Sequence, residues 1–307
     1  MADNDVNKVL ASSAGNSDVL TRKYFESLAI EMRLVDSEVA DCRFDFFGNE
    51  LPYPIMMGVI GGFHHLGENA MENACAAAGE LNTVYWVSSH VSDEDQAKLV
   101  ATGTKIAIVI KPFRDQQKFL EKIRRARELG VVAIASDIDH AYGKTGDYDQ
   151  QRDDQMGPKS VAELKEAVEA AYPLPFIAKG VLSVHDALKC REAGVSGIIL
   201  SHHHNIMASA VPPVMILPEV RKAVGDDYMV MVDCGINGGA EAFKAIASGA
   251  DAVLTARGYM TQLAKGGKEG VVEYIRKMAG EFRSFMSRTG SRDLHSIDPT
   301  VIHKLPF

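Results

Sequence analysis

Two apolar runs that flank one helical segment, all within Phe176–Asn205, constrain the fold of this chain most strongly. The runs Phe176–Lys179 and Gly197–Ser201 are nearly continuous in apolar residues, as strands buried on both faces must be. The segment between them, Ser183–Ala193, has a helical pattern. We therefore expect a parallel strand–helix–strand unit, whose two strands end in a lysine and in a serine with three histidines at the same edge of a sheet.

The same alternation extends over most of the chain. The predicted strands are Pro54–Val59, Val84–Ser88, Lys105–Ile110, Val131–Ser136, Phe176–Lys179, Gly197–Ser201, Met229–Asp233 and Ala252–Ala256. The predicted helices are Asn69–Ala78, Asp93–Thr102, Gln116–Leu129, Ser160–Ala171, Ser183–Ala193, Pro213–Ala223, Gly239–Ser248 and Gly267–Ser287. This repeat predicts a (β/α)8 TIM barrel. The alternative, a doubly wound sheet, usually has fewer strands and a GxGxxG turn that this sequence lacks.

The residues before the first barrel strand are predicted to form an extension of the barrel. Residues 1–18 are typical of a flexible leader, Val19–Met32 of a helix, and Arg33–Gly48 of a hairpin-like approach that turns at Gly48–Glu50. No long linker, repeat or low-complexity tract interrupts the sequence. We therefore expect one domain over residues 1–307.

The composition argues against several classes of protein. No run approaches the roughly 18 apolar residues of a membrane span, and the first residues lack the apolar core of a secretory signal. The four cysteines are scattered without CxxC spacing, which is typical of reduced thiols in the cytoplasm. The net charge of -8 argues against a nucleic-acid surface. We expect a soluble cytoplasmic protein that acts on a small molecule.

Polar residues follow the ends of the predicted strands, where a TIM barrel carries its active site. The fourth strand is followed by Asp137, Asp139 and His140. Gly-rich turns follow the last two strands, and such turns at helix N-termini bind phosphate, with Arg257 as an added charged fork. Because Lys179 is expected in the same cavity, the sequence predicts a phosphorylated aromatic cofactor such as a flavin.

The three consecutive histidines, His202–His204, follow the sixth predicted strand. Neighbouring side chains of an extended strand end point to opposite faces, so we do not expect these imidazoles to share a metal ion and predict no metal site. One imidazole acting as a general base near neutral pH is favoured instead. The polar loop Asp137–Lys159 is interpreted either as a lid over the site or as a solvated connection.

Motifs in the second half of the chain resemble one known family. They are Ile177-Ala178-Lys179-Gly180, the run 193–198, Ser201-His202-His203, the run 245–253 and Thr289-Gly290-Ser291. The segment Pro54–Asp298 is similar to FMN-dependent α-hydroxy-acid oxidases and dehydrogenases, which include glycolate oxidase and lactate oxidase. The resemblance implies a TIM barrel, FMN as cofactor and a homo-oligomer, often a tetramer.

The resemblance also implies roles for single residues. The family's catalytic histidine falls on His203, which would take a proton while a hydride passes to flavin N5. Lys179 would act at the N1/O2 edge of the flavin. The residues then expected to bind FMN are Val59, Ile60, Ser88, Ser136, Lys179, Ser201, Asp233, Gly235, Asn237, Ala256 and Arg257.

The chain departs from the family where the substrate is held. The arginine that binds the substrate carboxylate falls on Ile206, and a substrate-binding tyrosine falls on Lys111. The candidate substrate-binding residues are therefore Lys111, His202 and His204. Losing a charged hydrogen bond costs about 1.5–3 kcal/mol. We therefore expect a substrate other than a simple small 2-hydroxy acid.

Three functions are consistent with these features. The first is FMN-dependent oxidation of a hydroxy or amino carbon by base-assisted hydride transfer. The second is a flavin-dependent isomerase or other non-redox proton-transfer enzyme, for which His64, His65 and His202–His204 would supply acid and base groups. The third is a degenerate flavin-binding protein without turnover.

Overall fold

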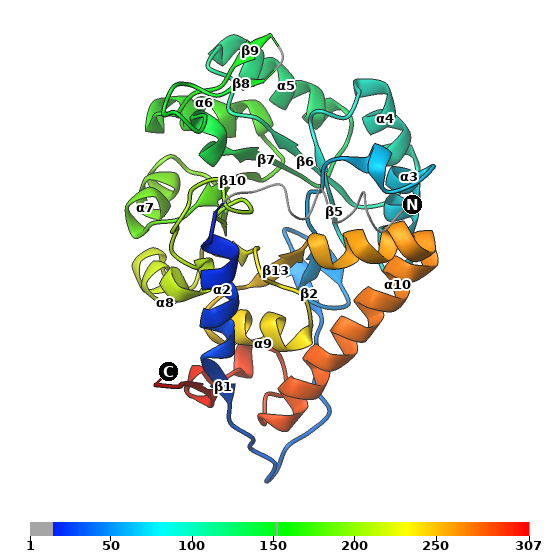
Figure 1. The fold of residues 1–307 in the computed structure, drawn as a ribbon, viewed down its shortest axis with the longest axis vertical. Coiled ribbons are helices and arrows are strands. Elements are labelled where there is room, and N and C mark those ends of the chain that lie inside the picture. The colour runs from blue at the N-terminus through cyan, green and yellow to red at the C-terminus, as the bar shows by residue number, and fades with distance from the viewer. Residues whose placement is uncertain (1–14, 152, 307) are drawn as a thin grey trace.

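The computed structural model describes residues 15–151 and 153–306, and at its centre is a closed barrel of eight parallel strands (Figure 1). Each strand pairs with its neighbours in the order β10-β11-β12-β13-β4-β5-β6-β7. The strands are β4 Ile55–Met57, β5 Tyr85–Ser88, β6 Ile106–Ile110, β7 Ala133–Asp137, β10 Phe176–Val181, β11 Gly197–Leu200, β12 Met229–Val232 and β13 Ala252–Thr255. The predicted TIM barrel and all of its predicted strands are confirmed.

A helix follows each barrel strand and covers the outside of the barrel (Figure 1). These helices are α3 Ala70–Glu80, α4 Asp93–Ala101, α5 Gln116–Glu128, α6 Val161–Ala171, α7 Val184–Glu192, α8 Pro213–Val224, α9 Gly239–Ala247 and α10 Arg257–Arg288. Local capping explains several of their starts: Ser160 and Glu163 form a reciprocal capping box before α6. Among the described residues, no helix has both the length and the apolar character needed to cross a membrane.

The last helix begins earlier than the sequence predicts. It starts at Arg257, whereas the sequence predicts Gly267 as its first residue. At Gly267 the backbone leaves helical geometry, with φ of 54° and ψ of -140°, so two helical segments meet there. Glycine is a poor helix former, and Gly266-Gly267 therefore concealed the first segment in the sequence.

The N-terminal extension differs from its prediction. The expected helix Val19–Met32 is α2 Ser17–Glu26, and the chain then forms β1 Leu28–Ile30. β1 pairs antiparallel with β14 Ile302–Lys304 near the C-terminus, beside which it lies in Figure 1. A pairing between the two ends of the chain leaves no local pattern, which is why the sequence suggested a longer helix.

The end of the predicted leader is part of α2. Residues 1–14 lie outside the described residues, but Ser17 begins the helix and is buried. Ser17 Oγ donates a hydrogen bond of 2.7 Å to the carbonyl of Met207 and accepts one of 3.0 Å from the backbone of Ala210. The leader prediction is therefore wrong for Ser17 and Asp18, which dock on the loop between β11 and α8.

A two-stranded hairpin, β2 Phe44–Phe46 and β3 Asn49–Leu51, packs at the amino end of the barrel. The hairpin is confirmed, but it turns at Phe47-Gly48 and not at Gly48–Glu50, with φ of 48° and 83° as a two-residue turn requires. Its buried side chains join the core inside the barrel, which includes Phe46, Leu51, Met56, Trp86, Val109, Ala135, Ile177, Ile199, Met231 and Leu254.

Side chains alternate along each strand between the barrel interior and the surrounding helices. In most strands, the side chain two residues after the last apolar interior residue also points into the barrel, and it is polar. The carboxyl end of the interior thus carries Ser88, Lys111, Asp137, Lys179, Ser201 and Asp233. This polar ring rests on the apolar core and forms the floor of the candidate site.

Candidate active site

A buried cluster of two lysines and two aspartates lies at this floor. Lys179 Nζ is 3.0 Å from Asp137 Oδ1 and 3.6 Å from Asp233 Oδ2. Lys111 Nζ donates a hydrogen bond of 2.8 Å to Asp137 Oδ2. Burial alone would raise the pKa of Asp137, but the charges of Lys179 and Lys111 hold that pKa well below its usual range. Burial would likewise lower the pKa of Lys179, and the charges of Asp137 and Asp233 raise it instead. Lys179 is therefore a fixed cation at neutral pH.

His203 lies beside this cluster. Its Nδ1 is 3.2 Å from Asp139 Oδ2 and 3.3 Å from Lys179 Nζ. Burial would raise the pKa of Asp139, and the charge and hydrogen bond of His203 lower it, so Asp139 is a carboxylate at neutral pH. Asp139 favours a proton on Nδ1, whereas the ammonium group of Lys179 can only donate to that nitrogen. With the proton on Nδ1, Nε2 of His203 is the atom that can accept a proton.

The backbone around His203 makes a left-handed turn. The φ angles are 45° at His203, 52° at His204 and 64° at Asn205, a conformation that non-glycine residues rarely adopt in succession. The backbone N–H of His203 donates a hydrogen bond of 3.0 Å to Ser201 Oγ, which helps to hold the turn. The assumption of an extended strand end here was wrong.

The three neighbouring imidazoles nevertheless point to different partners. His202 is buried, and its Nε2 is 2.9 Å from Thr21 Oγ1 on α2. Its ring does not line the cavity described below and helps to hold α2 on the site, and its predicted role in substrate binding stays a prediction. His204 does line the cavity and contacts Asp18 through Nδ1.

A further histidine, which the sequence placed after the fourth strand without a role, completes the site. His140 belongs to the 3-10 turn Ile138–Ala141, and its Nε2 is 3.0 Å from Nε2 of His203. Burial, with the nearby charge of His203, lowers the pKa of His140 to about 4. On its other side, His140 Nδ1 lies 3.4 Å from Gln151 Nε2 and 3.7 Å from Asp149 Oδ2. These groups form a path from His203 toward the loop surface.

The loop Asp137–Lys159 that carries these groups is folded against the barrel. Within it, β8 Gln150–Gln151 and β9 Asp154–Gln155 form a short antiparallel hairpin. Met156 is fully buried and bridges to Phe113, after the end of β6. These contacts favour a packed wall of the site over a freely solvated connection.

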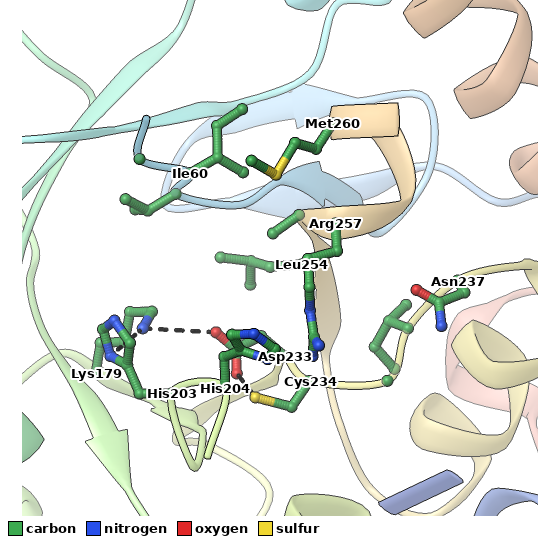
Figure 2. Close-up of a pocket in the computed structure, with 15 residues that line it drawn as sticks. Ile60, Lys179, His203, His204, Asp233, Cys234, Asn237, Leu254, Arg257 and Met260 are labelled. Atoms are coloured by element: carbon green, nitrogen blue, oxygen red, sulfur yellow. Dashed lines mark hydrogen bonds and ion pairs between the residues drawn. The ribbon is translucent and has the colours of Figure 1, made fainter. Parts of the chain in front are cut away.

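A cavity of about 250 Å³ opens beside Lys179 and His203 (Figure 2). Figure 2 shows apolar Ile60 and Met260 on one side of it, facing Lys179 and His203 on the other. The predicted site residues that line it are Val59, Ile60, Lys179, His203, His204, Asp233, Gly235, Asn237, Ala256 and Arg257.

Ser136 points away from this cavity. In the sheet it stands beside Ile110 and Ala178, whose side chains belong to the core between strands and helices. A shift of one residue moves a side chain to the other face of a strand. The expectation that Ser136 contacts the cofactor is therefore corrected, and Asp137 is the residue of β7 that faces the site.

Three other predicted residues belong to the interior polar ring without lining the cavity. Lys111 is held by Asp137, Ser201 accepts the hydrogen bond from the His203 backbone, and Ser88 Oγ accepts one from the backbone of His90. Their roles as cofactor or substrate contacts stay predictions.

A second, more open hollow of about 530 Å³ shares residues with this cavity. Gly235, Asn237 and Arg257 line both spaces. Arg257 donates from Nη1 and Nη2 to the two carboxylate oxygens of Asp18, at 2.6 and 2.7 Å. The sequence offered no signal for Asp18, because its contact with Arg257 joins residues 239 positions apart.

Among the described residues, one group of three side chains has possible metal ligand atoms within 4.8 Å of one another, namely Asp137, His140 and His203. Asp137 is already ion-paired with both Lys111 and Lys179, whose positive charges oppose a cation. We therefore assign no metal to this group.

The residues of the two spaces fit FMN. The apolar wall suits a flat ring, and Lys179 supplies a buried cation for the ring edge at which negative charge collects on reduction. Gly235, Asn237 and Arg257, which line both spaces, would hold the ribityl chain and the phosphate. The fit is least complete at the phosphate end, where Asn237 carries no charge and Arg257 is paired with Asp18.

Comparison with known proteins points to one family. The sequence profile of the FMN-dependent dehydrogenases matches residues 4–165 and 143–304. The 4-hydroxymandelate oxidase of Amycolatopsis orientalis is 30% identical, over 91% of this chain and 86% of that protein. Glycolate oxidase 3 of Arabidopsis thaliana is 28% identical, over 88% and 82%. The crystal structure of an arginine-to-leucine variant of mandelate oxidase with 2-hydroxy-phenylacetamide has a TM-score of 0.85 and 26% identity, over 98% of this chain and 93% of that chain.

Proposed function

Because the chain belongs to the FMN-dependent family of α-hydroxy-acid oxidases and dehydrogenases, we propose that it oxidises a carbon bearing a hydroxyl or amino group, with His203 as the base. The observation that carries the proposal is the placement of His203. Its Nδ1 lies 3.2 Å from Asp139 Oδ2, and its ring lines the cavity beside Lys179. This is the geometry of a general base oriented by a carboxylate.

Each side chain of the site has a separate role in the proposed reaction. Nε2 of His203 takes the proton of the substrate hydroxyl, and Asp139 stabilises the imidazolium that forms. Bound FMN supplies the acceptor for the hydride from the substrate carbon. Lys179, fixed by Asp137 and Asp233, places a positive charge beside the ring that becomes electron-rich.

His140 provides a route for the proton to leave. Its pKa of about 4 keeps the ring neutral at neutral pH, and its Nε2 lies 3.0 Å from Nε2 of His203, so His140 would relay the proton and carry a charge only transiently. Asp149 and Gln151 lie on its far side, toward the surface of the loop.

The substrate that we propose is an α-hydroxy compound without a small free carboxylate as its anchor. Ile206, at the position of the family's carboxylate-binding arginine, is 36% exposed and carries no charge. Lys179 and Arg257, the lysine and the arginine that line the cavity, are paired with aspartates. The related mandelate oxidase variant, in which a leucine replaces an arginine, has been crystallised with 2-hydroxy-phenylacetamide, which supports an uncharged α-hydroxy amide as a candidate.

The experiment is anaerobic bleaching of the flavin absorbance by a matched pair of compounds, mandelate and 2-hydroxy-phenylacetamide. We expect the amide to bleach the flavin faster than the acid, because the cavity lacks the arginine that would anchor the carboxylate. Faster bleaching by mandelate, glycolate or lactate contradicts the proposed substrate class. No bleaching by any α-hydroxy or α-amino compound contradicts the proposed reaction.

His203→Asn tests the base. We expect flavin reduction by the preferred substrate to slow by about 10²–10⁴-fold, since general-base catalysis typically contributes that much, while the flavin remains bound. His185→Asn, an exposed histidine of α7, is the matched control and should reduce the flavin normally. Normal flavin reduction by His203→Asn refutes the base assignment.

Non-redox proton transfer is the second candidate, and the contact between His140 and His203 favours it. His202 and His204 are held by α2, so this pair would supply the acid and the base; the side chain of His64 lies outside the described residues. Turnover that requires a chemically reduced flavin and consumes no electrons distinguishes this reaction from oxidation. A chain that binds flavin and supports neither reaction is the degenerate flavin-binding protein.

Assembly, location and domain structure complete the proposal. From the family resemblance we propose a homo-oligomer, with a tetramer as the first candidate, and from the composition a cytoplasmic protein. We propose further that residues 1–307 form one domain. Light scattering of the purified chain measures the assembly, and a monomer at micromolar concentration contradicts it. Limited proteolysis that releases a stable fragment contradicts the single domain.

A further inference from the structure

Asp18 occupies the part of Arg257 that an anionic ligand would use. Its two oxygens accept hydrogen bonds from Nη1 and Nη2 of Arg257, the bidentate arrangement by which arginine binds phosphate as well as carboxylate. Arg257 lines both the cavity and the second hollow. The chain thus places a carboxylate of its own on the arginine at the phosphate end of the site.

Several contacts hold Asp18 in this position. Asn205 Nδ2 donates to Asp18 Oδ2 at 2.9 Å, and the backbone N–H of Asp18 donates to Asn205 Oδ1 at 2.7 Å. His204 faces the same carboxylate. Burial alone would raise the pKa of Asp18, and the hydrogen bonds from His204 and Arg257 hold it well below its usual range. Asp18 is therefore charged at neutral pH.

The other charges of the second hollow do not restore an excess of positive charge. Arg22, which lines it, lies 3.1 Å from Glu241 and 3.0 Å from Glu26. A phosphate dianion that enters this hollow therefore meets arginines that are already paired with carboxylates.

We infer that Asp18 competes with the phosphate of FMN for the guanidinium of Arg257, and so sets how strongly this chain prefers FMN to riboflavin. The inference rests on the proposed placement of the phosphate at Arg257. When the phosphate takes the two Nη donors, the first turn of α2 loses its tie to Arg257. Loading of FMN and docking of the α2 start on the site are thereby coupled.

Flavin affinity of the full-length apoprotein tests the inference, with FMN and riboflavin as probes and quenching of flavin fluorescence as the readout. Asp18→Asn removes the charge and nearly keeps the shape. We expect it to strengthen FMN binding by about tenfold or more and riboflavin binding by less than about threefold. Asp227→Asn, which opens a similar bidentate pair with Arg191 on the surface, is the control and should change neither affinity. An unchanged or reduced preference for FMN in Asp18→Asn overturns the inference.

Hydrogen exchange of the wild-type chain provides a second measurement that needs no variant. Exchange in the first turn of α2 should become faster when FMN binds and stay unchanged when riboflavin binds. Slower or unchanged exchange with FMN overturns the inference even if Asp18→Asn does not fold. A wild-type chain that binds neither flavin overturns the proposed function as well, whereas binding of both with the same preference in Asp18→Asn overturns only the inference.

Discussion

At the scale of single residues, the site depends on which of its buried groups are charged and which are neutral. Asp137 and Lys179 are both buried and both charged, because each offsets the cost of burying the other. Among the described residues, the carboxylate paired with His140 is that of Asp149, at 3.7 Å, and burial keeps the imidazole neutral. A fixed cation and a neutral imidazole therefore stand on opposite sides of His203.

The lowered pKa of His140 predicts how stability depends on pH. Its pKa is about 4 in the folded protein and 6.5 as an ordinary histidine, so between these values the unfolded chain binds more protons at this residue. The free energy of unfolding should therefore fall as the pH is lowered through this window, by at most about 1.4 kcal/mol per pH unit from this group. Urea unfolding near pH 7 and near pH 5 measures the fall. His140→Asn should show a smaller fall than the wild type, and an equal fall in both contradicts the prediction.

At the scale of elements, close backbone contacts fix where the helices after β12 and β13 lie. α9 begins at Gly239, directly against α10. A Cβ at Gly239 would lie 2.5 Å from the backbone nitrogen of Phe282 and 2.7 Å from the carbonyl oxygen of Met278. Only glycine allows this approach, which sets the start of α9 beside Asn237 and the phosphate end of the site.

Gly239→Ala should therefore destabilise the protein. We expect a loss of about 1–3 kcal/mol in the free energy of unfolding, as for other overpacked contacts, because backbone atoms of α10 must move. Gly280→Ala, on α10 and with open space around its Cβ position, is the matched control and should be neutral or slightly stabilising. Equal stabilities of the two variants in urea unfolding contradict the assigned contact.

At the scale of the whole molecule, the two ends of the barrel have different tasks. The amino end is filled by apolar side chains of the β2–β3 hairpin, with Phe46 fully buried. The carboxyl end carries the polar ring, the cavity and the contacts of α2. Stability and flavin binding should therefore respond to changes at opposite ends.

Phe46→Ala tests this separation. Removal of a buried phenylalanine typically costs about 3–5 kcal/mol, whereas the affinity for FMN should stay unchanged because the site lies at the other end. Val39→Ala, at a side chain that is 72% exposed, should change neither quantity. Thermal unfolding and FMN titration of the three proteins measure both effects. Weaker FMN binding by folded Phe46→Ala contradicts the separation.

The sequence by itself determined the barrel, because its signals are local. Each buried strand is a continuous apolar run, and each helix has its own period and ends, so all eight repeats could be predicted. Lys179, Asp233 and Arg257 could be expected near one another for the same reason, since they follow apolar runs whose carboxyl ends must meet, and all three line the cavity. The Gly266-Gly267 pair misled the prediction of α10, because local propensity there is overruled by packing.

Only the tertiary structure decided which groups meet at the site. Asp18 and Arg257, His140 and His203, and β1 and β14 are pairs whose partners come from separate segments, and no local pattern records them. The sequence named Ser136, whereas Asp137 is the residue of β7 that faces the site, and this difference has another cause. A shift of one residue moves a side chain to the other face of a strand, and the sequence pattern is compatible with either residue. The strands positioned the site, and the packing of α2 and the loop after β7 against them supplied its partners.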